Sequence, residues 1–340
     1  SNIGTETIII SADDAGGPET DVEGGVTITE NTFDTADDGV IFLDTNGQTG
    51  KKFVEGNTYE VINNNFTSIA NYGVATGDYS GSGNVGIVVN ATLNYWGETE
   101  GPGNRNEFTD GADVSDEVDY TPWHNEDYSA VITDTNGTVQ NAVNKTDSGE
   151  ATVLAPGEYN GTANITTDDI TLAGGTNPSE VTINSTRNAG TVNVSADKIT
   201  IDNVTLNGSV DNNVIQSKSN GGVLNVTNSN ITVNTDDGEI TNPNPDIKDE
   251  QPPIGIDTDF AVNVDNVTIK GDNKSSAWGI TTRGGDASDG SDIIHSNITN
   301  VSVGLQTRGA DNINVHRNKL SKIQYSAVFA TSRQSDITAY

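Results

Sequence analysis

Cysteine and methionine are both absent from the 340 residues of the chain. Without cysteine, neither disulfides nor thiolate metal sites can form, which leaves the compartment open because an extracellular protein need not contain them. Without methionine the sequence has no initiator, so we expect that processing removes a leader or that this is an internal piece of a longer protein. It has no signal-peptide apolar region and no apolar run near ~18 residues, so we expect any membrane anchor to lie outside this sequence.

Large side chains are scarce as well. Aromatic residues make up 6% of the sequence and apolar residues 32%, whereas glycine occurs 37 times. This is little material for a globular core, and disorder is the alternative for such a composition. Recurrent alternation of Val and Ile with polar residues argues against disorder. It favours a solenoid, in which each rung needs only a thin line of inward aliphatic side chains.

Basic residues are few. The chain has 16 Lys and Arg against 49 Asp and Glu, a net charge of −33. Such a charge excludes nucleic acid as a partner and makes an anionic membrane surface repulsive. Acidic residues spread along the whole chain resemble the composition of proteins from extreme halophiles, where molar salt screens the repulsion. The alternative is an ordinary acidic secreted protein.

Two of the three Trp residues lie in one stretch at about a third of the chain. Residues 94–97 read Asn-Tyr-Trp-Gly, residues 101–102 Gly-Pro, and residues 119–123 Asp-Tyr-Thr-Pro-Trp. This pair of motifs resembles the carboxy-terminal closure of right-handed parallel β-helix domains in bacterial and archaeal surface proteins. The resemblance implies a structural cap formed by Asn94, Trp96, Gly97, Pro122 and Trp123.

The segment after this closure is similar to the start of a second β-helix domain. Residues 138–143 and the strand-like residues 151–159, which end in Pro-Gly-Glu-Tyr, resemble the opening helix and first rung of the pectin-lyase-like superfamily. Val139 and Val143 are four residues apart and share one helix face. The sequence therefore predicts an all-β fold with two right-handed parallel β-helix segments in tandem. Residues 1–127 are the carboxy-terminal part of a first helix with its closing cap, and residues 128–340 the amino-terminal part of a second.

Internal repeats give the expected register of the rungs. Residues 26–33 align with residues 59–66 at a spacing of 33, which pairs Asn31 with Asn64. Near the other end, residues 294–299 align with residues 315–320 at a spacing of 21, which pairs Asn297 with Asn318. Both pairs predict asparagine ladders, in which stacked side-chain amides bond along the solenoid. The second alignment also stacks His295 on His316, which we interpret as incidental rather than as a metal or acid–base site.

Catalytic patterns are not evident. A polysaccharide lyase or hydrolase of this superfamily needs a basic residue beside calcium-binding acids, or a clustered trio of carboxylates. Arg283 and Arg308, in successive Thr-Arg-Gly turns, are the one basic pair in phase. Asp286, Asp289 and Asp292 suggest a calcium site, the one cofactor considered, although the loop does not complete an EF-hand and a solvated acidic turn is the alternative. We expect no enzymatic activity.

Asn-x-Ser/Thr sequons occur sixteen times, which suggests an exported glycoprotein. The alternative is that a fold using Asn at corners and Thr on strands produces sequons without selection. We expect Asn297, as a ladder residue, to face inward and stay unmodified. The glycosylation sites predicted from polar turns are Asn136, Asn144, Asn160, Asn207 and Asn273.

These observations predict a structural or adhesive glycoprotein from the surface or an extracellular filament of a halophile, with archaea the expected source. The first segment has a closure but no opening cap, and the second has an opening cap but no closure. Uncapped rungs can add further strands, so we expect copies to stack head to tail, or the sequence to be one period of a longer tandem chain. The alternative is a carbohydrate-active β-helix, either a polysaccharide lyase or a viral tail-spike that binds cell-surface glycans.

Overall fold

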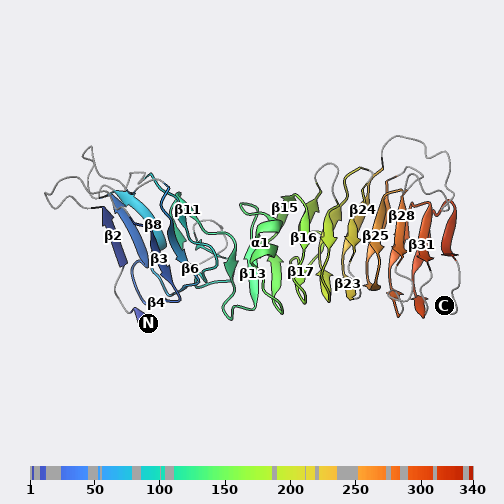
Figure 1. Cartoon of the computed structure of the whole chain (residues 1–340), viewed down its shortest axis with the longest axis horizontal. Helices are drawn as coiled ribbons and strands as arrows, with labels where there is room; N and C mark the ends of the chain where they lie inside the picture. Colours follow the sequence, from blue (N-terminus) through green and yellow to red (C-terminus); the bar gives the residue numbers. More distant parts are fainter. Residues whose placement is uncertain are drawn as a thin grey trace. The chain divides into compact units, whose positions relative to one another are not determined.

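The computed structural model of the chain is mostly β (Figure 1). It describes residues 2–3, 8–12, 24–44, 53, 56–78, 86–99, 101–103, 111–185, 190–210, 212–218, 222–235, 252–272, 277–283, 290–308, 312–331 and 337–339. The chain divides into two compact units, Ser1–Ile132 and Thr133–Tyr340. The boundary predicted between residues 127 and 128 lies close to this division.

The C-terminal unit is a parallel β-solenoid built from three sheets. In each rung the chain passes through the first, the second and then the third sheet. Its first sheet contains β14 (Ala151–Leu154), β17 (Thr171–Ala173), β20 (Ile199–Asp202), β23 (Val223–Thr227), β26 (Ala261–Asp265), β29 (Asp292–Ile294), β32 (Ile313–His316) and β35 (Ile337–Ala339). Its second sheet contains β15 (Gly157–Asn160), β18 (Val181–Asn184), β21 (Thr205–Asn207), β24 (Asn230–Val233), β27 (Thr268–Gly271), β30 (Asn297–Thr299) and β33 (Lys319–Ser321). Its third sheet contains β16 (Ala163–Ile165), β19 (Val192–Val194), β22 (Ile215–Ser217), β25 (Ile254–Thr258), β28 (Trp278–Thr282), β31 (Val303–Arg308) and β34 (Ser326–Thr331).

Alternation along each strand builds a narrow aliphatic core. In β18, Val181 and Ile183 are fully buried, whereas Thr182 and Asn184 between and after them are partly exposed. The parallel register then places aliphatic side chains of successive rungs on one another. In the third sheet this forms a buried column of Ile215, Ile256, Ile280 and Leu305. Burying one such side chain stabilises the fold by about 1.5–3 kcal/mol. One line of inward aliphatic side chains per sheet is therefore sufficient to form the core.

The turn from the first sheet to the second repeats a two-residue corner. Its first residue has a left-handed backbone at Asn203, Asn228, Asn266, His295 and Arg317, with φ between 47° and 58°. Asparagine adopts this conformation readily, which explains its frequency there. The second residue of the corner is Val204, Ser229, Val267, Ser296 or Asn318 and points inward, and where it is Ser or Asn its side chain accepts a backbone N–H of the preceding rung. The Oγ of Ser296 accepts from Val267 at 3.2 Å.

This register corrects one prediction. Asn297 is opposite Lys319 and Ile294 is opposite His316, a spacing of 22 rather than 21. The predicted ladder of Asn297 on Asn318 is therefore wrong. The corner accommodates Ser or Asn equally, so Ser296 occupies the position that Asn318 takes in the next rung. The Oδ1 atom of Asn318 accepts the Ser296 backbone N–H at 2.8 Å.

Helix α1 (Val139–Lys145) begins the C-terminal unit, as predicted, and contacts β14 and β16. Thr138 caps its first turn, because its Oγ1 accepts the Asn141 backbone N–H at 3.1 Å. Val139 and Val143 are both buried, together with Ala142. The four-residue spacing therefore does place one apolar helix face over the first rung.

The N-terminal unit contains three smaller parallel sheets. Its first sheet contains β3 (Val26–Thr29), β6 (Tyr59–Ile62), β9 (Val89–Asn90) and β11 (Val118–Asp119). Its second sheet contains β1 (Asn2–Ile3), β4 (Thr32–Asp34) and β7 (Asn65–Thr67). Its third sheet contains β2 (Ile8–Ala12), β5 (Val40–Asp44), β8 (Tyr72–Asp78) and β10 (Asp113–Val114). Finally, β12 (Trp123–His124) pairs antiparallel with β13 (Ala130–Thr133).

The core of this unit uses aromatic rings where the other uses aliphatic chains. Phe33 and Phe66 face each other in register, as the 33-residue repeat predicts, with ring centroids 4.9 Å apart. Trp96 continues the stack on Phe66 at 5.1 Å. All three side chains are fully buried, so three successive rungs share one column of rings.

Candidate functional site

An asparagine ladder lies at the corner between the first and second sheets of the N-terminal unit. The Oδ1 atom of Asn64 accepts the Asn31 backbone N–H at 3.0 Å and its side-chain N–H at 3.2 Å. The Oδ1 atom of Asn94 accepts from Asn64 in the same way, at 2.8 and 3.2 Å. Asn94, which the motif assigned to the cap, is thus the third member of the ladder. These bonds fix three rungs in one register.

The other cap residues surround the end of this ladder. Trp123 donates its indole N–H to the Thr99 carbonyl at 2.9 Å, and Pro122 accepts from the Leu93 backbone at 2.7 Å. Gly97 has φ +90°, a backbone that its lack of a side chain permits. Trp96 is fully buried, and its Nε1 atom has no hydrogen-bond partner in the described part of the chain. The motif residues are therefore close together, and their contacts are those of a packed structural cap.

The imidazole ring of His295 makes polar contacts with two neighbouring side chains at the surface. Its Nδ1 atom lies 2.8 Å from Asp265 Oδ1, and its Nε2 atom 3.4 Å from a guanidinium nitrogen of Arg317. The ring of His316 is 6.2 Å away, edge to face. No group of three or more His, Asp or Glu side chains suited to a metal occurs among the described residues.

The predicted calcium site falls mainly outside the described residues, which include neither Asp286 nor Asp289. Asp292 is described, on β29, where its Oδ1 atom accepts the side-chain N–H of Asn314 at 2.7 Å. This contact belongs to an outward amide column along the first sheet. Calcium binding by the loop stays a prediction.

The predicted glycosylation sites differ in their surroundings. Asn136, Asn144 and Asn160 are exposed, whereas Asn273 lies outside the described residues. Asn207 is partly buried and donates its side-chain N–H to Asn184 at 2.9 Å, and the exposed Asn136 donates its side-chain N–H to Asp134 at 3.0 Å. Asn297 lies on the outward face of β30, not the inward face, which removes the reason for expecting it to stay unmodified.

A group of buried polar side chains lies on the outward face of the third sheet of the C-terminal unit. Asp257 on β25 bonds to the Nε atom of Arg283 at 2.6 Å and to the side-chain N–H of Asn213 at 2.8 Å. Burial raises the pKa of the Asp257 carboxyl, and the nearby Arg283 only partly opposes the shift. Arg283 and Arg308 follow the register partners Thr282 and Thr307, so they are in phase as predicted.

Two further side chains complete this group. Thr281 and Gln306 extend the outward column of Asp257 along the next two rungs, and both are fully buried. In the described part of the chain, neither the Thr281 hydroxyl nor the two amide atoms of Gln306 have a hydrogen-bond partner. Beside them runs an apolar column of Ile254, Trp278 and Val303. Sequence reasoning singled out Arg283 and Arg308 but missed Asp257, Thr281 and Gln306, because the sequence does not reveal that both faces of β25, β28 and β31 are buried.

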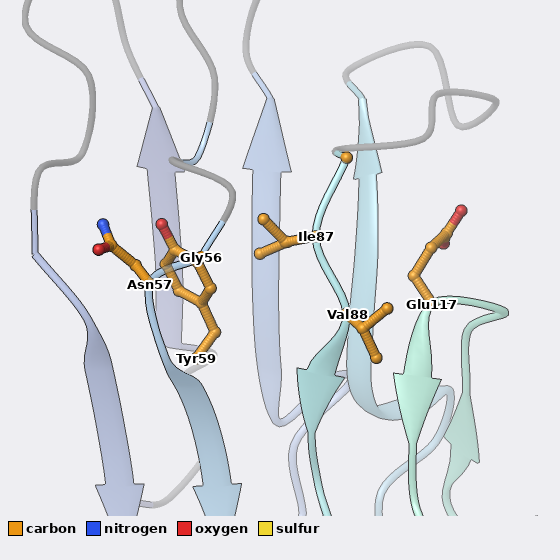
Figure 2. A pocket seen from close by; sticks show the side chains of 7 residues that line it. Gly56, Asn57, Tyr59, Ile87, Val88 and Glu117 are labelled. Atoms are coloured by element: carbon orange, nitrogen blue, oxygen red, sulfur yellow. The ribbon is translucent and has the colours of Figure 1, made fainter.

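A pocket of about 440 Å³ opens on the N-terminal unit (Figure 2). It lies where β6, β9 and β11 begin, and its lining residues are Gly56, Asn57, Tyr59, Gly86, Ile87, Val88 and Glu117. The carboxylate of Glu117 accepts the Thr76 hydroxyl at 2.7 Å. The side chain of Val88 is 68% exposed at the rim. None of these contacts identifies a ligand for the pocket.

Comparison with known proteins returns no match. No protein-family model matches the chain, and no curated protein or solved structure does so either. The resemblance to pectin-lyase-like surface proteins therefore rests on the motifs and on the solenoid architecture. Among the described residues, no helix has the length and apolar character needed to cross a membrane.

Proposed function

We propose that this chain is a structural or adhesive extracellular protein whose copies join head to tail by stacking their rungs into filaments. In this proposal the two units are parts of two right-handed β-helices in tandem. The observation that supports it is that, among the described residues, the outermost strands of each unit pair with a neighbour on one side only. An open edge exposes unpaired backbone groups and apolar side chains, on which another chain can add strands.

The open edge of the C-terminal unit is formed by β33, β34 and β35, the last strands of their sheets. Val328 on β34 is 37% exposed, although its register partner Leu305 in the preceding rung is 1% exposed. Leu320 and Ile323 are only partly buried against the core. Tyr325 is 51% exposed nearby. The aliphatic core therefore continues to the last rung without a cover of its own among the described residues.

The N-terminal unit has its open edge at β1, β2 and β3. Ile8 and Ile10 on β2 are partly exposed, whereas their partners Val40 and Phe42 are fully buried. Ile9 between them is 57% exposed. Both edges are parallel, so each can accept the other without a change of strand direction.

Composition supports an extracellular, high-salt setting for the filament. The net charge of −33 suits a surface that meets molar salt, and the exposed sequons suit a glycoprotein. We propose N-glycans at Asn136, Asn144 and Asn160, on the exposed side chains described above. Peptide mass spectrometry of native material tests this. Modification at none of the three contradicts the glycoprotein assignment.

Sedimentation of residues 1–340 in 2 M NaCl tests self-association. The proposal predicts a sedimentation coefficient that rises with protein concentration. Val328→Asp puts a charge into the open edge and should abolish the rise, because stacking would bury that charge without a partner. Val88→Asp is the matched control, since Val88 is exposed far from either edge strand in the sequence and should leave association intact. A monomer at every concentration contradicts the proposal.

A further inference from the structure

The outward face of the second sheet in the C-terminal unit differs from the acidic surface around it. The six strands from β18 to β33 each place two residues on this face, in one continuous register. On these described strands none of the outward residues is Asp or Glu; they are Thr, Asn, Ser and two lysines. The first sheet, by contrast, presents Asp202, Asp265 and Asp292 outward. A chain with 49 Asp and Glu among 340 residues thus leaves this face without carboxylates.

Two Asn-x-Thr sequons lie entirely on this face. Residues two apart in a strand point to the same side of the sheet, so an outward sequon presents its amide and its hydroxyl together. In β24 the outward pair is Asn230 and Thr232, both partly exposed on either side of a buried isoleucine. In β30 it is Asn297 and Thr299, again partly exposed on either side of a buried isoleucine.

We infer that the outward face of the second sheet carries N-linked glycans, attached to the folded solenoid at Asn230 and Asn297. This inference rests on the glycoprotein part of the proposed function and names the face that is modified. Glycans are bulky and solubilising, so they hydrate a face that lacks carboxylates. The absence of acidic residues and the presence of strand sequons on one face therefore have a single explanation.

The spacing of the rungs allows both sites to be occupied together. Asn230, Thr268 and Asn297 are register partners on three successive strands. Adjacent strands are about 4.8 Å apart, so the two asparagines are about 10 Å apart along the column. Asn184 and Asn207, by comparison, lie on adjacent strands and bond to each other. Two glycans on that pair would compete for the same space, so we expect at most one of the two to be modified.

The attachment reaction determines which atoms must be accessible. The Nδ2 atom of the asparagine forms a bond to the anomeric carbon of a sugar donor whose leaving group is a phosphate. The bond between that carbon and the phosphate oxygen breaks, the phosphate leaves with the electron pair, and a base of the transferase takes the amide proton. The acceptor sequence requires Ser or Thr two residues after the asparagine. A transferase that acts on the folded chain must therefore reach both the amide and this hydroxyl.

The next sequon along the chain, Asn300-Val-Ser, does not meet this requirement. Ser302 is 1% exposed, and its hydroxyl donates to the Ala277 carbonyl at 3.2 Å. Nearly the same acceptor sequence thus occurs twice, three residues apart. The hydroxyl of Thr299 lies on the outward face, whereas that of Ser302 is buried, so the fold favours Asn297 over Asn300.

The same criterion narrows the set of sites proposed above. Thr146, two residues after Asn144, is 3% exposed and donates its hydroxyl to the Ala142 carbonyl at 2.9 Å. The threonines that follow Asn136 and Asn160 by two residues are at least partly exposed. A transferase that acts on the folded chain therefore reaches Asn136 and Asn160 but not Asn144.

Glycopeptide mass spectrometry of native material tests the inference, and Asn300 is the matched control. Trypsin releases residues 284–308 as one peptide that contains both sequons, because no Lys or Arg lies between Arg283 and Arg308. Electron-transfer fragmentation of this peptide assigns a sugar mass to one asparagine or the other. The expected result is sugar on Asn297 and none on Asn300. The tryptic peptide of residues 219–248 reports on Asn230 in the same way and should carry sugar there.

The outcomes separate this inference from the function on which it rests. Sugar at Asn136 or Asn160, with Asn230 or Asn297 bare, overturns the inference and leaves the glycoprotein assignment standing. Equal occupancy of Asn297 and Asn300 also overturns it, because the transferase would then act without regard to the fold. Native material without sugar at any sequon overturns both the inference and the glycoprotein assignment.

Discussion

Asn64 is the residue on which the register of the N-terminal unit depends most. It is fully buried, and it accepts from Asn31, donates to Asn94 and donates to the carbonyl oxygens of Ile28 and Ile62 at 3.0 Å. Removing such a side chain leaves several buried polar groups without partners, and each costs about 1–3 kcal/mol. Its amide therefore contributes more to stability than an average hydrogen bond.

We predict that Asn64→Ala lowers the free energy of unfolding by about 3 kcal/mol, the loss of a buried hydrogen-bond network. Urea unfolding followed by circular dichroism measures it. Asn71→Ala is the matched control, because Asn71 is exposed and its backbone N–H makes the bond to Asp37. Equal effects of the two substitutions would mean that the ladder does not stabilise the rungs.

The free energy of unfolding should depend on pH through the carboxyl group of Asp257. Burial raises the pKa of its carboxyl above the ordinary 3.8, so the folded state binds more protons than the unfolded state between that value and the raised one. Stability contributed by the protonated carboxyl is therefore lost as pH rises through this window. We predict that Asp257→Asn, which cannot titrate, gains stability relative to the wild type as pH rises through it. Parallel pH profiles of unfolding free energy for the two proteins would contradict this.

At this scale, sequence reasoning succeeds where one residue type is required and fails where two are interchangeable. The repeat of Asn31 at Asn64 gave the correct register, because a buried ladder there uses Asn in each rung. Ser296 and Asn318 fill the same corner with different side chains, so matching Asn297 to Asn318 shifted the rung by one residue. The carboxyl of Asp257 gave no signal, since its burial depends on tertiary packing.

At the scale of elements, glycine decides how closely the third-sheet strands stack. A methyl group at Gly279 would clash with the Gly304 carbonyl oxygen and lie 2.8 Å from a methyl carbon of Ile298. A methyl group at Gly304 would in turn lie 2.6 Å from the carbonyl oxygen of Ala327. Glycine is therefore needed where β25, β28 and β31 enter the sheet, at Gly255, Gly279 and Gly304.

We predict that Gly279→Ala destabilises the C-terminal unit by about 1–3 kcal/mol, the usual cost of overpacking. Gly77→Ala on β8 is the control, because an added methyl group there meets no atom within 4 Å. It should leave stability unchanged or raise it by up to about 1 kcal/mol through reduced freedom of the unfolded chain. Thermal unfolding of both variants makes the comparison, and a Gly279→Ala midpoint equal to the wild type contradicts it.

Strands and the opening helix could be predicted because their signals are local. Alternation marks β18 and β20, and the spacing of Val139 and Val143 marks α1. The outward face of the third sheet could not be predicted in this way. In β28 and β31, buried residues occur on both faces, so a periodic pattern does not reveal which side meets the core.

For the whole molecule, charge is the dominant global property. The net charge of −33 is spread over the sequence, and its self-repulsion acts over about 30 Å at 0.01 M salt but about 3 Å at 1 M. The sequence was sufficient for this inference, because net charge does not depend on the fold. The assignment of each strand to a rung, by contrast, required the sheet topology, since it is known only from the pairing of the strands.

We predict that the fold is most stable above molar NaCl or KCl and loosens in dilute buffer, because screening removes the repulsion between carboxylates. Circular dichroism melts across a salt series measure the midpoint. A higher midpoint at 50 mM than at 2 M salt would show that the acidic surface is not an adaptation to salt.

Electron cryomicroscopy of the chain in 2 M NaCl tests the central claim of head-to-tail stacking most directly. The density at each contact between copies should show the β1–β3 edge of one copy beside the β33–β35 edge of its neighbour, with parallel strands continuous through the contact. The same images should show one polarity along each filament. Isolated particles with open edges, or contacts that join two like edges, would contradict the account.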